Sequence, residues 1–149
     1  MALIFTSGDM FNFGCFDIYV NTVNCVGIMG KGIALQFKQK FPDYFKDYKK
    51  ACNEGLYFPG HIYEYKQSSD LSIISFTTKD HWRSPSRYAW IKSGLKELRV
   101  YLKEITWKKR VAVPALGCSN GGLSWSQVKP MIEQELGSLE DEITVFNPW

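Results

Sequence analysis

Two glycine-rich loops in this chain have the residue types that bind an anionic, hydroxyl-rich ligand. The first loop contains Gly27, Gly30 and Gly32; it follows a short apolar run with two asparagines and continues directly into an amphipathic pattern. The second loop spans residues 117–123 (GCSNGGL). Backbone N–H groups and the dipole of a helix N-terminus attract anions, and side-chain amides bond to hydroxyl groups. A ligand site is therefore the first hypothesis.

The common phosphate-binding motifs do not fit the first loop. Its order G-I-M-G-K-G reverses the spacing of the dinucleotide fingerprint, and Lys31 precedes a glycine where a Walker loop has a hydroxyl residue that holds magnesium. The glycines could serve tight turns alone. However, each loop follows a predicted strand and precedes a predicted helix, and such loops converge at the carboxyl ends of neighbouring strands. We therefore expect a diphosphate cradle that works without a metal.

The elements that must position these loops alternate in type along the second half of the chain. Apolar runs predict strands, and stripes at helical spacing predict helices. The strands are predicted at residues 2–6, 17–20, 61–66, 71–76, 111–116 and 143–146, and the helices at 32–41, 43–52, 86–105 and 124–136. Residues 11–16 read as irregular, and residues 124–127 (SWSQ) have the form of a capping box. The class is α/β with a mixed, mostly parallel sheet.

Composition limits the possible functions. The 149 residues predict a single domain over 1–149, and 45% hydrophobic with 22% charged residues argues against disorder. The net charge of +3 permits contact with phosphates without requiring a nucleic acid. Four cysteines without a CxxC pair, and two histidines, predict no metal site. With no long apolar segment, the sequence predicts no membrane contact and a cytoplasmic protein.

Three motifs in order resemble those of a macrodomain, the ADP-ribose-binding fold: SGDM at 7–10, NTVN at 21–24 and GKGIA at 30–34. The longer segments VNTVNCVGIMGKGIALQFK, TTKDHWRS and PALGCSNGGLSW resemble the DarG type of macrodomain, an antitoxin that removes ADP-ribose from thymidine in DNA. The human terminal ADP-ribose protein glycohydrolase is in the same subgroup. The resemblance covers essentially the whole chain and implies a three-layer α/β/α macrodomain.

The resemblance implies roles for particular residues. Asp9 would contact the adenine amino group; the alternative is that it caps a turn. Asn24 would lie at the distal ribose and take part in catalysis; the alternative is a loop asparagine whose amide is hydrogen-bonded within the protein. Trp82 could also stack on a base. The residues expected to bind ADP-ribose are Gly8, Asp9, Met10, Asn21, Gly30, Lys31, Gly32, Ile33, Ala34, Gly117, Cys118, Ser119, Asn120, Gly121, Gly122 and Leu123.

Lys79 matches the catalytic lysine of the DarG-like subgroup. It follows the apolar run 71–76 and two threonines, at the carboxyl end of a predicted strand. A desolvated lysine that is neutral near pH 7 can attack C1 of the distal ribose and form a covalent sugar adduct. The human relative has an aspartate where this chain has Gly121, which leaves the general acid or base unassigned. Asp80 and His81 are adjacent candidates.

The predicted function is an ADP-ribosyl hydrolase, a glycosidase-type enzyme without a cofactor, acting on thymidine in single-stranded DNA. The basic and aromatic segment around His81, Trp82 and Arg83 suits a nucleic acid. The expected partners are ADP-ribose, ADP-ribosylated DNA and a DarT-like toxin, and the chain is expected to be monomeric. Two alternatives remain: hydrolysis of glutamate-ester ADP-ribose or ADP-ribose 1″-phosphate, and non-catalytic ADP-ribose binding.

Overall fold

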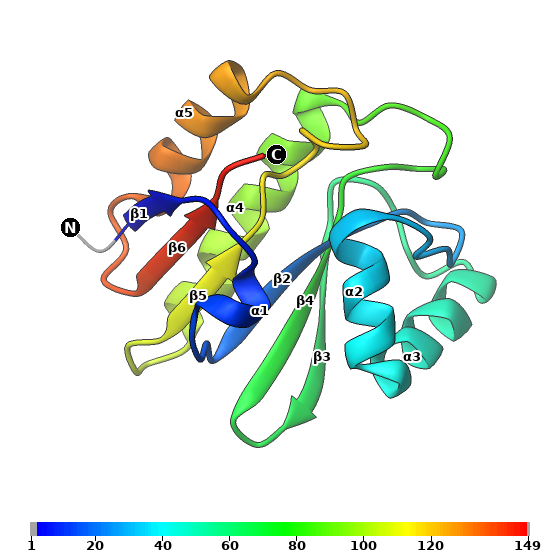
Figure 1. Cartoon of the computed structure of the whole chain (residues 1–149), viewed down its shortest axis with the longest axis horizontal. Helices are drawn as coiled ribbons and strands as arrows, with labels where there is room; N and C mark the ends of the chain where they lie inside the picture. Colours follow the sequence, from blue (N-terminus) through cyan, green and yellow to red (C-terminus); the bar gives the residue numbers. More distant parts are fainter. Residues whose placement is uncertain (1–2, 149) are drawn as a thin grey trace.

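A six-stranded sheet with helices on both faces makes up the computed structural model, which describes residues 3–148 (Figure 1). The strands are β1 (Leu3–Thr6), β2 (Ile18–Val23), β3 (Ile62–Ser68), β4 (Leu71–Thr77), β5 (Arg110–Val113) and β6 (Glu142–Phe146). The helices are α1 (Met10–Phe13), α2 (Gly32–Lys40), α3 (Pro42–Asn53), α4 (Tyr88–Glu104) and α5 (Trp125–Leu136).

The strands lie in the order β1-β6-β5-β2-β4-β3. Every neighbouring pair is parallel except β3 and β4, which are antiparallel. The predicted mixed, mostly parallel sheet is thus confirmed. The interior strands have continuous apolar runs because both faces of the sheet are covered, as in β4, where Ile73, Ile74 and Phe76 are fully buried.

The two faces of the sheet carry different side chains. The face covered by α4 and α5 is mainly aliphatic, with Leu95, Leu98 and Ile132 among its buried residues. The face covered by α1, α2 and α3 is aromatic and includes Phe37 and Tyr44 (Figure 1). These two cores give the three-layer α/β/α arrangement.

Several predicted boundaries differ from the structure. Strand β2 runs on to Val23 and not only to residue 20, so Asn21 lies inside the sheet opposite Ser75. Its side-chain Nδ2 donates to the Tyr44 hydroxyl at 3.1 Å, which gives the amide nitrogen a partner inside the protein. Strand β5 ends at Val113 because the next residue, Pro114, has no N–H to donate to a neighbouring strand. Of the predicted strand 2–6, Ala2 lies outside the described residues.

Two local predictions were wrong. Residues 11–16 are not irregular throughout, because α1 forms there with Asp9 as its N-cap; the carboxylate accepts from the Phe11 N–H at 2.9 Å. The capping box at 124–127 does not form. Ser124 is the N-cap of α5, but its hydroxyl lies 2.8 Å from the Ser126 hydroxyl and makes no bond to the helix backbone.

Helix α4 packs on β4 through Gly94. A Cβ atom at this position would lie 2.3 Å from Cζ of the buried Phe76 ring. We predict that Gly94→Ala lowers the free energy of unfolding by about 1–3 kcal/mol in urea denaturation, because overpacking outweighs the helix propensity gained. Lys96→Ala, at an exposed position of the same helix, should change it by less than about 0.5 kcal/mol. Equal stabilities for the two variants would contradict this contact.

Candidate active site

A cavity of about 840 Å³ opens at the carboxyl ends of the parallel strands. Each of the five parallel strands contributes a lining residue at or just after its end. These residues are Gly8 after β1, Asn24 after β2, Lys79 after β4, Pro114 after β5 and Asn147 after β6. Such a crevice is where open α/β sheets bind their ligands, and its volume suits a nucleotide-sized molecule.

The two glycine loops meet across this cavity. A Cβ atom on Gly32 would lie 3.3 Å from Nδ2 of Asn120, so the loops approach each other closely. Helix α2 starts at Gly32; its N-cap, Lys31, makes no side-chain capping bond, and its first turn contains no acidic residue. The first backbone N–H groups of α2 and its positive dipole end are therefore suited to an anion.

Gly121 leaves no room for a side chain in the second loop. A Cβ atom there would lie 2.4 Å from the carbonyl oxygen of Gly117 and 2.3 Å from Oγ of Ser86. The Gly117 oxygen is backbone and cannot move without moving the loop. An aspartate at position 121 would therefore require a different loop conformation.

Lys79 is half-buried at the wall of the cavity. Its Nζ donates to the backbone carbonyl of Trp82 at 3.2 Å. Burial lowers the pKa of Lys79 below its ordinary value, and the positive charge of Lys31 lowers it further. A larger share of Lys79 is thus a neutral amine near pH 7 than for an exposed lysine.

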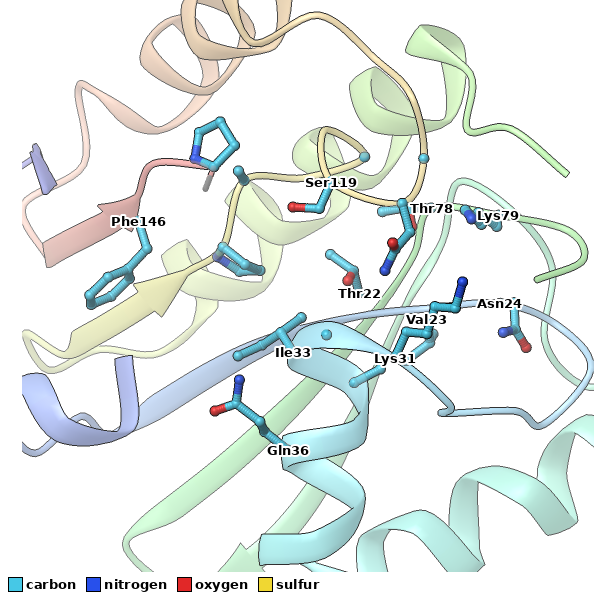
Figure 2. Close-up of a pocket in the computed structure, with 18 of the residues that line it drawn as sticks. Thr22, Val23, Asn24, Lys31, Ile33, Gln36, Thr78, Lys79, Ser119 and Phe146 are labelled. Carbon is cyan, nitrogen blue, oxygen red and sulfur yellow. The ribbon is translucent and has the colours of Figure 1, made fainter. Parts of the chain in front are cut away.

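The lining residues lie toward two ends of the cavity. Figure 2 shows Asn24, Lys31 and Lys79 gathered toward one end, and Gln36 and Phe146 toward the other. The cavity is thus long enough to separate two groups of a ligand.

Asp9 lies at the wall of the cavity but also has a structural task. Its carboxylate accepts from the Phe11 N–H at 2.9 Å and from Asn12 Nδ2 at 3.2 Å. The neighbouring Ser7 accepts from Asn147 Nδ2 at 3.2 Å, which joins the ends of β1 and β6 beside the cavity.

The sequence matches the Macro domain family over residues 20–132. A solved structure, the macrodomain of Mycobacterium tuberculosis DarG, superposes with a TM-score of 0.91 at 39% identity, covering 99% of this chain and 98% of that one. The chain belongs to the macrodomain family.

The chain is also similar to proteins whose names state an activity or a ligand. A Thermus aquaticus protein named DNA ADP-ribosyl glycohydrolase is 45% identical over 89% of this chain and 38% of its own length. A Thermosipho africanus DNA ADP-ribosyl transferase-DNA ADP-ribosyl glycohydrolase fusion protein is 36% identical over 98% of this chain and 42% of its own. The structure of Thermosipho africanus DarTG in complex with ADP-ribose gives a TM-score of 0.88 at 35% identity, over 97% of this chain and 41% of that one. This macrodomain thus spans about two fifths of the length of the curated relatives it matches.

The macrodomain brings most of the predicted site residues to one cavity. Those that line it are Gly8, Asp9, Met10, Asn24, Gly30, Lys31, Gly32, Ile33, Ala34, Lys79, Trp82, Arg83, Gly117, Ser119, Asn120 and Gly121. Those that do not are Asn21, His81, Cys118, Gly122 and Leu123. Asn21 is buried inside the sheet, and Leu123 packs against the aliphatic core, so their side chains point away from the ligand space.

Sequence reasoning missed several lining residues. They are Ser7, Thr22, Val23, Ile28, Gln36, Thr78, Pro114, Ala115, Phe146, Asn147 and Pro148. Most of them stand at or next to the end of a strand, and that position was the signal that could have found them. Separately, in the part of the chain that the structure describes, no helix is both long and apolar enough to cross a membrane.

Proposed function

We propose that this macrodomain removes ADP-ribose from thymidine bases of single-stranded DNA, with Lys79 as the nucleophile. The observation that carries the proposal is a half-buried lysine of lowered pKa at one end of a cavity built for a nucleotide. The names of the relatives, DNA ADP-ribosyl glycohydrolase, supply the substrate class.

The proposed ligand orientation follows from the two ends of the cavity. The adenine lies toward Phe146, at the end of the cavity away from Lys79 (Figure 2). Asp9, which also lines the cavity, supplies a carboxylate for the adenine amino group. The diphosphate lies over the N-terminus of α2 and the loop at 117–121, and the distal ribose reaches Asn24 and Lys79. The ADP-ribose complex of the Thermosipho africanus relative supports the choice of ligand.

The proposed reaction has two steps, the transfer of ADP-ribose to Lys79 and the release of ADP-ribose by water. Neutral Lys79 Nζ forms a bond to C1″ of the distal ribose while the bond from C1″ to the thymine nitrogen breaks. The electron pair leaves with the base, which takes up one proton, and the new secondary ammonium releases one. Water then attacks C1″, the bond from C1″ to Nζ breaks, and the leaving lysine amine takes up the proton that the water loses, so the products are free ADP-ribose and unmodified DNA.

The DNA part of the substrate would extend past Trp82 and Arg83, beside the reacting lysine. The Arg83 guanidinium lies 4.5 Å from the centre of the Trp82 ring, and both residues line the cavity. A guanidinium binds phosphate, and the aromatic and guanidinium planes offer stacking surfaces to bases.

Arg83→Gln should lower kcat/KM for an oligonucleotide and make kcat/KM less dependent on salt concentration, because the variant lacks the charge that would contact a phosphate.

The deciding experiment compares two substrates. A thymidine-ADP-ribosylated oligonucleotide and a glutamate-ADP-ribosylated peptide are incubated with the protein, and the ADP-ribose released from each is measured. We expect a higher kcat/KM for the oligonucleotide. A marked preference for the peptide would overturn the DNA assignment, and no release from either would favour a non-catalytic ADP-ribose reader.

The pH dependence of kcat should change when the positive charge of Lys31 is removed. Because Lys79 attacks as the neutral amine, kcat rises with pH as Lys79 loses its proton. Lys31→Met removes a neighbouring positive charge, so the pKa of Lys79 rises and the increase in kcat moves to higher pH. Lys31→Arg keeps the charge and should keep the profile. An unchanged profile in Lys31→Met would show that this charge does not act on Lys79.

We propose in addition that the substrate is made by a DNA ADP-ribosyl transferase. The Thermosipho africanus fusion protein, which joins the two activities by name, supports this. Co-expression with such a transferase should restore the growth of bacteria that the transferase inhibits, and the Lys79→Ala variant should not restore it.

A further inference from the structure

Tyr48 reaches the wall of the cavity from behind. It is fully buried on α3, a helix that contributes no residue to the lining. Its hydroxyl oxygen lies 2.8 Å from two acceptor atoms of Asn24, the backbone carbonyl oxygen and the side-chain Oδ1, which share its one hydrogen. Asn24 itself does line the cavity, at the end that contains Lys79 (Figure 2).

The hydrogen bonds of Asn24 fix which way its amide points. Oδ1 accepts from the Tyr48 hydroxyl, from the Val26 N–H at 3.1 Å and from the Ile28 N–H at 3.4 Å, while Nδ2 donates to the Ile28 carbonyl at 2.8 Å. Backbone N–H groups can only donate, so a flipped amide would place donors against donors. Oδ1 has no accepting capacity to spare, and one N–H of Nδ2 has no partner among the described residues.

We propose that Tyr48 is a positioning residue, which holds the Asn24 amide so that its remaining Nδ2–H donates to a ligand oxygen in the cavity. The identity of that oxygen, a hydroxyl of the distal ribose next to the bond that breaks, rests on the proposed function. Asn24 then acts as a hydrogen-bond donor, and it cannot serve as the base that activates water.

Burial keeps the Tyr48 hydroxyl in the form that this role needs. Desolvation raises the pKa of Tyr48 above its ordinary value, so the hydroxyl stays protonated and donates throughout the working pH range. The hydrogen bond from this hydroxyl to Asn24 orients the amide even without a ligand.

Tyr44 provides a matched control on the same helix. It is also buried, and burial raises its pKa to about 12. Its hydroxyl lies 2.6 Å from Oγ of Ser75 and accepts from Asn21 Nδ2 at 3.1 Å, and neither of these residues lines the cavity. Removing either tyrosine hydroxyl deletes a buried hydrogen-bonding group, but only the Tyr48 hydroxyl contacts Asn24.

The test compares Tyr48→Phe with Tyr44→Phe in the full chain. With a thymidine-ADP-ribosylated oligonucleotide, we expect kcat of Tyr48→Phe to fall by roughly 10- to 100-fold, because a misplaced group near the reacting atoms costs about this much. KM should change by a few-fold at most, and Tyr44→Phe should stay within about 2-fold of the unmodified protein in kcat. Equal losses in the two variants, or an unchanged kcat in Tyr48→Phe, would overturn the proposal.

A second measurement does not depend on turnover. The side-chain amide protons of Asn24, followed by NMR in ¹⁵N-labelled protein, should exchange faster with water in Tyr48→Phe and remain as in the unmodified protein in Tyr44→Phe. If the unmodified protein releases no ADP-ribose, the proposed function fails, and the Asn24 signal still tests whether Tyr48 orders the amide. Unchanged exchange in Tyr48→Phe refutes the positioning role whatever the activity.

Discussion

Lys79→Ala should lower the release of ADP-ribose from modified DNA by at least about 10³-fold, because it removes the proposed nucleophile. Binding of ADP-ribose should change little. In the free protein the Lys79 amine bonds to the Trp82 carbonyl, and the diphosphate would be held mainly by backbone groups of the two glycine loops. Single-turnover kinetics measure the first effect, and calorimetry with ADP-ribose measures the second.

Two further variants make this prediction specific to a neutral amine. Lys79→Arg keeps a positive charge, but a guanidinium does not lose its proton at working pH, so it should be as inactive as Lys79→Ala. Lys66→Ala removes an exposed lysine of β3 and should leave turnover unchanged. Turnover by Lys79→Arg close to that of the unmodified protein would mean that charge, and not nucleophilic attack, is what position 79 supplies.

Much of the fold could be predicted because its elements are strongly patterned. The apolar stripe of α4 keeps helical spacing along the whole helix, and β4 is a short apolar run of strand length, so the sequence predicts helix and strand at the right segments. Helix α1 was missed because four residues are too few to show a period. Its signal lay in Asp9, for which the sequence allows the cap of a turn and which is the N-cap of this helix.

The candidate site was predictable where it depends on loops after strands. Asn21 shows the limit of that reasoning: its polarity suggested a loop, but Tyr44, 23 residues further along the chain, offers it a buried hydrogen bond. Phe146 was missed for a related reason. Strand β6 reaches the cavity because it lies between β1 and β5 in the sheet. Local sequence patterns do not predict the order of strands in a sheet.

Lys109 is the clearest case of a residue whose role only the structure shows. In the sequence it stands in the basic run of Lys108, Lys109 and Arg110, which is typical of an exposed connection. In the structure its side chain is 2% exposed, and Nζ lies 3.0 Å from Oδ1 of Asp141. Nζ also donates to the carbonyl oxygens of Leu102, Ile105 and Trp107 at 2.9, 3.1 and 2.9 Å. The side chain thus closes the C-terminal end of α4 and ties it to the start of β6.

We predict that Lys109→Met lowers the free energy of unfolding by about 3–5 kcal/mol, because it removes the positive charge paired with the buried Asp141 carboxylate and leaves the carbonyl groups at the end of α4 without their donor. Urea denaturation followed by circular dichroism measures the loss. The matched control is Lys108→Met, the same change at an exposed neighbour, which should alter stability by less than about 0.5 kcal/mol. If both variants unfold at the same urea concentration, Lys109 adds no more to stability than a surface lysine. A loss confined to Lys109→Met would show that one buried ammonium joins α4 to β6, the strand that brings Phe146 to the cavity.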